Sequence, residues 1–298
     1  MKYTLSALLI WLIFSSCEKA INFNLQQSTS KLVVDGSIEN GKPPMIILST
    51  SLDYFSQISA SILEKSFVHN AIITISNGTK TQQLKEYSIP ADSTGYTLYY
   101  YSIDSSDLSN AFVGEFNTTY TLKIIVNGVE YDAQTHITSV AKRIDSIDWQ
   151  EAPQDPEKPD TTKAVLVATI TDPKGYGDYT RYYTSVNDSA FYPGLNSVYD
   201  DQITDGTTYT VQVDKGVNRN QKIDLNNYSF FHRGDTVVIK FCNIDKGTYD
   251  FWRTMEYDYQ SIGNPFSSPT TVLGNISNNA LGAFCGYAAQ YVPIIIPK

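Results

Sequence analysis

Among the residues that could take part in chemistry, the cysteine nearest the N-terminus is the most informative. Cys17 directly follows two serines, and these follow an apolar run over residues 5–14 with Lys2 before it. A positive start, a short apolar stretch and small residues before a cleavage point are typical of a signal peptide. Lipoprotein signal peptides need a cysteine in this place, because its thiol accepts a diacylglycerol before cleavage. We therefore predict a signal peptide over residues 1–16 and lipid attachment at Cys17.

The apolar run is too short to be a stable membrane span. Ten residues rise about 15 Å as a helix, roughly half the thickness of a bilayer's hydrocarbon core. Several acyl chains on one cysteine make a durable anchor, since each buried methylene contributes about 0.8 kcal/mol. The alternative is an ordinary secretory signal that is cut near Cys17. Residues 17–30 are polar and suit a short lipidated tether, but they do not indicate whether the protein faces the periplasm or the cell exterior.

Cys242 and Cys285 remain as an even pair once Cys17 carries lipid. Disulfides persist in an oxidising compartment. Both cysteines lie on predicted strands of the second half of the chain, so we predict a disulfide joining the strands that flank a predicted helix. The alternative is two separately buried thiols.

Motifs for catalysis are weak. The three histidines, His69, His136 and His232, are far apart and form no His-x-x-x-His pair, which argues against zinc and histidine-based catalysis. Residues 139–142 match Ser-x-x-Lys, a pattern short enough to arise by chance. Paired carboxylates for glycoside hydrolysis depend on a three-dimensional separation. We predict no catalytic residue and no cofactor.

Two groups of aspartates offer the oxygen ligands that calcium prefers. One is Asp172 with Asp178, and the other is Asp200 with Asp201 and Asp205. Neither fits the Asp-x-Asp-x-Asp-Gly loop with its distant glutamate. We therefore predict solvated turn residues and no metal site.

Composition favours a mainly β protein with an acidic surface. The 298 residues include 22 tyrosines, and tyrosine, threonine, valine and isoleucine suit half-buried strands. The length allows about two domains. A formal net charge of −9 repels the phosphates of nucleic acids, so we predict no nucleic-acid partner.

Short alternating segments predict an immunoglobulin-like or transthyretin-like antiparallel sandwich over residues 31–140. Asn127-Gly128 is a type I′ hairpin signal. Tyr99 and Tyr101 point to one side of a strand and Tyr100 to the other, so we expect these rings to pack. Residues 52–69 suit an edge loop with a short helix. The predicted strands cover residues 31–38, 45–50, 71–76, 82–87, 96–103, 120–126 and 129–137.

The second half, residues 141–298, is predicted to be a second β-rich, sandwich-like domain with one helix. The helix covers residues 245–262, begins at the capping residue Asp245 and is stopped by Gly263 and Pro265. We interpret residues 152–163 as an exposed loop rather than an interdomain linker. The predicted buried face is Tyr249, Trp252, Met255, Tyr259 and Ile262. The predicted strands cover residues 144–151, 164–171, 179–186, 207–214, 236–242 and 282–289.

The order of motifs in the chain is more specific than any one of them. A Gly-Asp-Thr before a strand is followed by a Tyr- and Asp-rich helix, then Gly-Asn-Pro-Phe, Asn-Ile-Ser and Leu-Gly-x-Phe, supported upstream by residues 32–36 and 171–175. This order resembles a Bacteroidota outer-membrane lipoprotein family, domain of unknown function 4249, from Cys17 to the C-terminus. Cys285 departs from the small or aromatic residue expected there.

The resemblance implies outer-membrane placement and a position beside a TonB-dependent receptor. We expect a lipid-anchored binding or scaffold protein, accessory to such a receptor in nutrient uptake, and no enzyme. The alternatives are a surface glycan-binding adhesin or hydrolase, and a purely structural envelope protein. Internal packing of Tyr99, Tyr101, Tyr179 and Tyr183 would argue against the glycan alternative.

Overall fold

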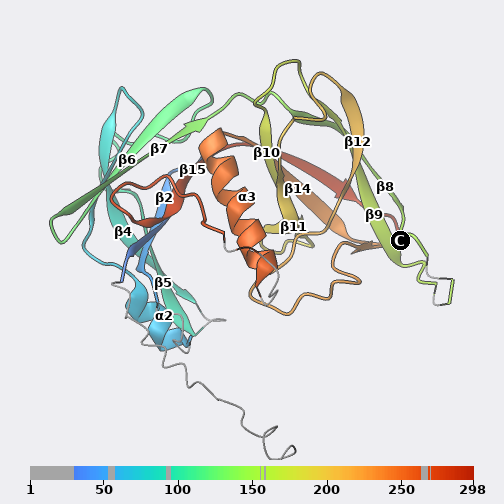
Figure 1. The fold of residues 1–298 in the computed structure, drawn as a ribbon, viewed down its shortest axis with the longest axis horizontal. Coiled ribbons are helices and arrows are strands. Elements are labelled where there is room, and N and C mark those ends of the chain that lie inside the picture. The colour runs from blue at the N-terminus through green and yellow to red at the C-terminus, as the bar shows by residue number, and fades with distance from the viewer. Residues whose placement is uncertain are drawn as a thin grey trace, which may run out of the picture.

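A computed structural model of the protein describes residues 30–52, 58–91, 95–154, 156–157, 159–262, 268 and 270–298. The chain is mainly β with one long helix near the C-terminus, as the sequence predicted. Figure 1 shows two groups of strands with this helix between them. Cys17, the tether and the predicted helix stop at Gly263 and Pro265 lie outside the described residues. None of the helices in the described ranges is both long and apolar enough to cross a membrane.

The first group of strands, which we name the first lobe, matches the predicted segments closely. Alternation in β6 buries Tyr120, Leu122 and Ile124, and the turn to β7 places Asn127 and Gly128 at φ 50° and 80°, which confirms the type I′ signal. The short helix expected in residues 52–69 is present. The elements are β1 (Leu32–Glu39), β2 (Met45–Thr50), α2 (Ala60–Ser66), β3 (Ile72–Ser76), β4 (Thr81–Ala91), β5 (Tyr96–Ile103), β6 (Thr118–Val126) and β7 (Val129–Ile137).

The second group, which we name the second lobe, contains two strands that the sequence did not predict, β11 and β13. Its elements are β8 (Arg143–Glu151), β9 (Lys163–Thr171), β10 (Tyr179–Val186), β11 (Tyr192–Tyr199), β12 (Thr208–Val213), β13 (Phe231–His232), β14 (Thr236–Ile244) and α3 (Lys246–Ser261).

The last strand, β15 (Leu281–Ile295), runs through both lobes (Figure 1). Its first half pairs in parallel with β1, from Val33↔Leu281 to Glu39↔Tyr287. Its second half pairs antiparallel with β14, from Asn243↔Ala288 to Thr236↔Ile295. The parallel pair was not predicted. The predicted domain boundary near residue 140 lies between β7 and β8, while β15 belongs to both sides of it.

These pairings join the strands into one large sheet and one small sheet. The large sheet has 11 strands in the order β11-β10-β14-β15-β1-β2-β5-β4-β3-β6-β7. The small sheet has four strands, with β12, β8 and β13 all pairing with β9. In the second lobe the small sheet packs on one face of β10 and β14, and α3 packs on the other.

Helix α3 begins as predicted, because the Asp245 carboxylate accepts a hydrogen bond from the backbone N–H of Thr248 at 2.7 Å. The same carboxylate accepts one from the backbone N–H of His136 in β7 at 2.7 Å, which ties the helix to the first lobe. The predicted buried face is partly wrong: Ile262 is 75% exposed, while Glu256 is buried. Ile262 lies outside α3 and is its C-cap residue.

Candidate functional site

A cavity of about 630 Å³ is lined by residues of both sheets of the second lobe and of α3, and we name it the aromatic cavity. Its volume falls within the range of small-molecule sites, roughly 300–1,000 Å³. Five elements each contribute an aromatic side chain: Tyr182 from β10, Tyr199 from β11, Tyr209 from β12, Phe241 from β14 and Tyr249 from α3. Two charged residues, Asp200 and Arg253, also line it.

The tyrosine rings give the cavity flat apolar surfaces and neutral hydroxyl groups. Tyr182 and Tyr199 stack with ring centroids 6.3 Å apart and an interplanar angle of 19°. Burial, with Asp214 and Glu256 nearby, raises the pKa of Tyr199 to about 12. Burial also raises the pKa of Tyr182, so both hydroxyls stay protonated at neutral pH and can act as donors.

An irregularity in β11 shapes this wall of the cavity. The register between β10 and β11 shifts between Arg181 and Tyr183. A Cβ at Gly194 would stand 2.1 Å from the Tyr182 hydroxyl oxygen, so only glycine leaves room for that ring. Pro193 and Gly194 disfavour a regular strand, which explains why sequence patterns did not predict β11.

The loop over residues 201–207 forms one edge of the cavity opening, where Ile203 is 94% exposed. Two carboxylates fasten this loop to the turn after β9. Asp201 accepts hydrogen bonds from the backbone N–H groups of Gly177 and Asp178, at 2.7 and 3.0 Å. Asp205 accepts one from Gly175 at 2.6 Å. Loop position therefore depends on the aspartates that the sequence analysis assigned to solvated turns.

The structure brings together members of both predicted aspartate groups. Asp172, Asp178 and Asp201 each place a carboxylate oxygen within 4.8 Å of the others, whereas the sequence grouped Asp201 with Asp200 and Asp205. Asp172 and Asp201 are buried, so the prediction that these residues are solvated is wrong for them.

Lys142 is the counter-ion of this acidic group. Its Nζ lies 2.8 Å from Asp172 Oδ2, and the two side chains are 1% and 0% exposed. Thr204, on the cavity loop, donates a hydrogen bond to the same Asp172 oxygen at 2.7 Å. Since Lys142 is held in this ion pair, the Ser-x-x-Lys match at residues 139–142 has no free amine.

We predict that Asp178→Asn stabilises the protein at neutral pH. Burial and the neighbouring Asp172 and Asp201 raise the pKa of Asp178 above 3.8. The folded state thus holds this proton more tightly than the unfolded state, and stability is lost as pH rises through that window. Urea unfolding should show a gain of at most about 1 kcal/mol at pH 7, since solvent screens the group, and no change at pH 3.

The control is Asp148→Asn, which alters an exposed carboxylate on β8 and should change nothing at either pH. A loss of stability at pH 7 in Asp178→Asn would show instead that the folded protein uses this charge.

A polar network fixes α3 on the sheet beside the cavity. The buried Arg181 guanidinium stacks 3.4 Å from the Trp252 ring centroid and donates to Ser197 Oγ at 3.1 Å. The buried Glu256 accepts hydrogen bonds from the Ser197 backbone N–H and from Arg219, each at 2.9 Å. Sequence reasoning did not identify these residues. For Arg181 a signal was present, because a charged residue in the middle of an otherwise buried strand indicates a buried polar contact.

A comparison with known protein families finds one that matches nearly the whole chain. A family model described as Domain of unknown function (DUF4249) matches residues 18–291. The chain belongs to this family. The match begins directly after Cys17 and continues into β15, so it covers both lobes. No curated protein matches the chain.

In this DUF4249 protein Cys242 and Cys285 are free, buried thiols. The predicted disulfide between them is therefore wrong. Cys242 pairs with Ala289, which lies four residues beyond Cys285 on the same strand. Four strand residues span about 13 Å, and a disulfide needs Cα atoms within roughly 7 Å. Strand register, which local patterns did not reveal, therefore separates the two sulfurs.

We predict that both thiols are unreactive until the protein unfolds. Burial raises the pKa of each to about 12, so neither forms the nucleophilic thiolate at pH 8. Iodoacetamide should leave both unmodified in the native protein and alkylate both in urea without reductant, as measured by intact mass. Denatured protein that resists alkylation until it is reduced would contradict this prediction.

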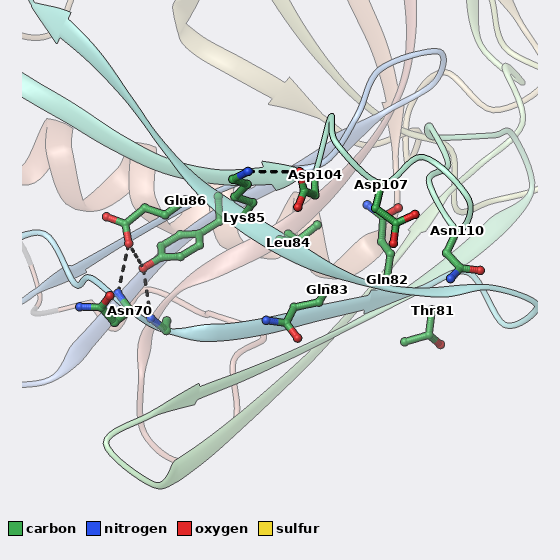
Figure 2. Close-up of a pocket in the computed structure, with 12 residues that line it drawn as sticks. Asn70, Thr81, Gln82, Gln83, Leu84, Lys85, Glu86, Asp104, Asp107 and Asn110 are labelled. Atoms are coloured by element: carbon green, nitrogen blue, oxygen red, sulfur yellow. Dashed lines mark hydrogen bonds and ion pairs between the residues drawn. The ribbon is translucent and has the colours of Figure 1, made fainter.

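A second recess in the DUF4249 protein, of about 480 Å³, lies in the first lobe beside β4, and we name it the polar recess. Figure 2 shows Asn70 and Glu86 at one end of it and Asp107 and Asn110 at the other. Glu86 contacts His69 and accepts a hydrogen bond from the Asn70 backbone at 3.1 Å, and these contacts tie the segment before β3 to β4. Among the described residues that line it, the largely buried Tyr101 is the one aromatic, so we regard the aromatic cavity as the stronger candidate site.

The tyrosines singled out by sequence are packed. Tyr101 is 2% exposed, and Tyr99 packs against Phe67 with centroids 5.6 Å apart. Tyr179 stacks on Tyr249 at 4.7 Å, and Tyr183 meets Tyr287 edge-on at 6.4 Å. The rings that line the aromatic cavity come instead from elements far apart in the sequence.

Proposed function

We propose that the protein is a lipid-anchored binding protein of the outer membrane that captures a small molecule in the aromatic cavity. The observation that carries the proposal is the cavity itself, a 630 Å³ space with five aromatic walls and a few polar groups. That combination of apolar surface and sparse polar groups is characteristic of small-molecule sites.

Binding is favoured over catalysis by the groups around the cavity. Of the described residues that line it, Asp200 is the one carboxylate, and glycoside hydrolysis needs a pair of them. The packing of Tyr99, Tyr101, Tyr179 and Tyr183 also counts against a glycan-binding adhesin or hydrolase. These observations support the binding proposal over that alternative.

Ligand capture is tested by screening small fragments with ligand-observed NMR. Val211 lies at the opening and is 38% exposed, so Val211→Trp should obstruct the cavity and abolish the signals of bound fragments. Val129→Trp, an equal change at an exposed position of the first lobe, should retain them. The proposal falls if no fragment binds, or if Val211→Trp binds the same fragments as the unaltered protein.

The anchor and the partner are tested separately. Cys17→Ala should release the protein from the detergent fraction, and mass spectrometry of the mature N-terminus should find fatty acid on Cys17.

We further propose that the anchored protein works beside a TonB-dependent receptor in nutrient uptake, since anchoring raises the local concentration of the cavity around a barrel. Purification from mild detergent without any barrel protein would count against this partnership.

A further inference from the structure

The two charged residues of the aromatic cavity differ in what they contact. Asp200 already accepts a hydrogen bond from the Tyr249 hydroxyl at 3.2 Å. Arg253, one helical turn after Tyr249 on α3, is exposed at the cavity wall. Across the part of the chain that the structure describes, Arg253 forms neither an ion pair nor a hydrogen bond. The cavity therefore presents one unpaired guanidinium.

This cation stands beside an apolar interior. Tyr182, Ile239 and Phe241 are buried and form the inner wall, while Tyr199 lies nearer the opening and is 47% exposed. A molecule that fills the space meets ring faces along its body and Arg253 at one end. Of the described residues that line the cavity, Arg253 is the one cation, on a chain whose formal net charge is −9.

We propose that the ligand of the aromatic cavity is a small organic anion with an aromatic or apolar body, whose carboxylate or similar group pairs with Arg253. This inference rests on the proposed function. The planar guanidinium presents paired N–H groups that match the two oxygens of a carboxylate. The tyrosine rings bury the rest of the molecule through apolar contact and stacking.

The test uses three probes with the same ring and chain length: 3-phenylpropionate, 3-phenylpropan-1-ol and 3-phenylpropylamine. Calorimetry and ligand-observed NMR measure their affinities at pH 7 and low salt. The acid is expected to bind at least about tenfold more tightly than the alcohol, since hydrogen bonds to a charged group are the stronger ones. The amine is expected to bind more weakly than the acid.

Arg253→Leu should lower the affinity of the acid far more than that of the alcohol and so remove the preference for the acid. Lys246→Leu is the matched control, because it removes a positive charge from the same helix outside the cavity and should keep the preference. Equal affinity of acid and alcohol, a preference that survives Arg253→Leu, or no binding of the acid overturns the ligand class. Such a result leaves ligand capture standing if the fragment screen still depends on Val211.

Discussion

Replacing Lys142 by methionine is expected to lower the free energy of unfolding by about 3–5 kcal/mol, the usual cost of breaking a buried ion pair. Methionine keeps most of the apolar stem but leaves Asp172 buried without its counter-ion. Asp172 Oδ1 already lacks a hydrogen-bond partner, and Oδ2 would keep the Thr204 hydroxyl as a donor but lose its cation. Asp178 and Asp201 add further negative charge nearby.

Urea unfolding at pH 7 measures this effect, and Lys123→Met is the control. Lys123 pairs with Glu130 at the surface, where its side chain is 44% exposed, so its loss should cost far less stability than the loss of Lys142. The double variant Lys142→Met with Asp172→Leu should recover much of the stability, because it removes the uncompensated charge as well. If Lys142→Met were as mild as Lys123→Met, the pair would not act as a buried ion pair.

Gly282→Ala is expected to destabilise the protein by at least about 2 kcal/mol and to loosen the junction between the lobes. Gly282 has φ of +91°, a conformation that costs other residues about 1–3 kcal/mol. An added Cβ would also stand 2.0 Å from the backbone oxygen of Val34, its partner in β1. The backbone must therefore shift where β15 meets β1.

Hydrogen exchange locates this damage, and Gly247→Ala is the matched control. Amides of β1 should exchange faster in Gly282→Ala, while those of β9 stay protected. Gly247 lies in the first turn of α3 with an open position for a Cβ, so alanine there should be neutral or stabilising by up to about 1 kcal/mol. Unchanged exchange in β1 would mean that the close approach at Gly282 is easily relieved.

Local patterns predicted most elements because each signal acts between near neighbours. Asp245 and the apolar spacing after it define α3, and alternation defines β6 and β7. Pairing of β1 with β15 joins opposite ends of the chain, and no local pattern specifies it. Strand β11 was missed for a different reason, since Pro193 and Gly194 are adapted to the bulge around Tyr182.

The candidate site was harder to predict than the fold. Aspartates 172, 178 and 201 were noted as possible cation ligands, but their grouping around Lys142 depends on where three separate turns meet. The aromatic rings of the cavity come from five elements, so no spacing in the sequence marks it. Arg253 is one of several charged residues on α3, and the sequence alone does not show which of them lines a cavity.

The position of β15 also determines when the large sheet can be completed during folding. β1 is synthesised long before β15, so its second neighbour does not exist until β15 has been made. The large sheet therefore cannot be completed before β15 has been synthesised, and contacts between such distant segments make closure slow. A chain that ended before β15 would leave an open edge on β1 and another on β14, and unpaired edges readily recruit other chains into aggregates.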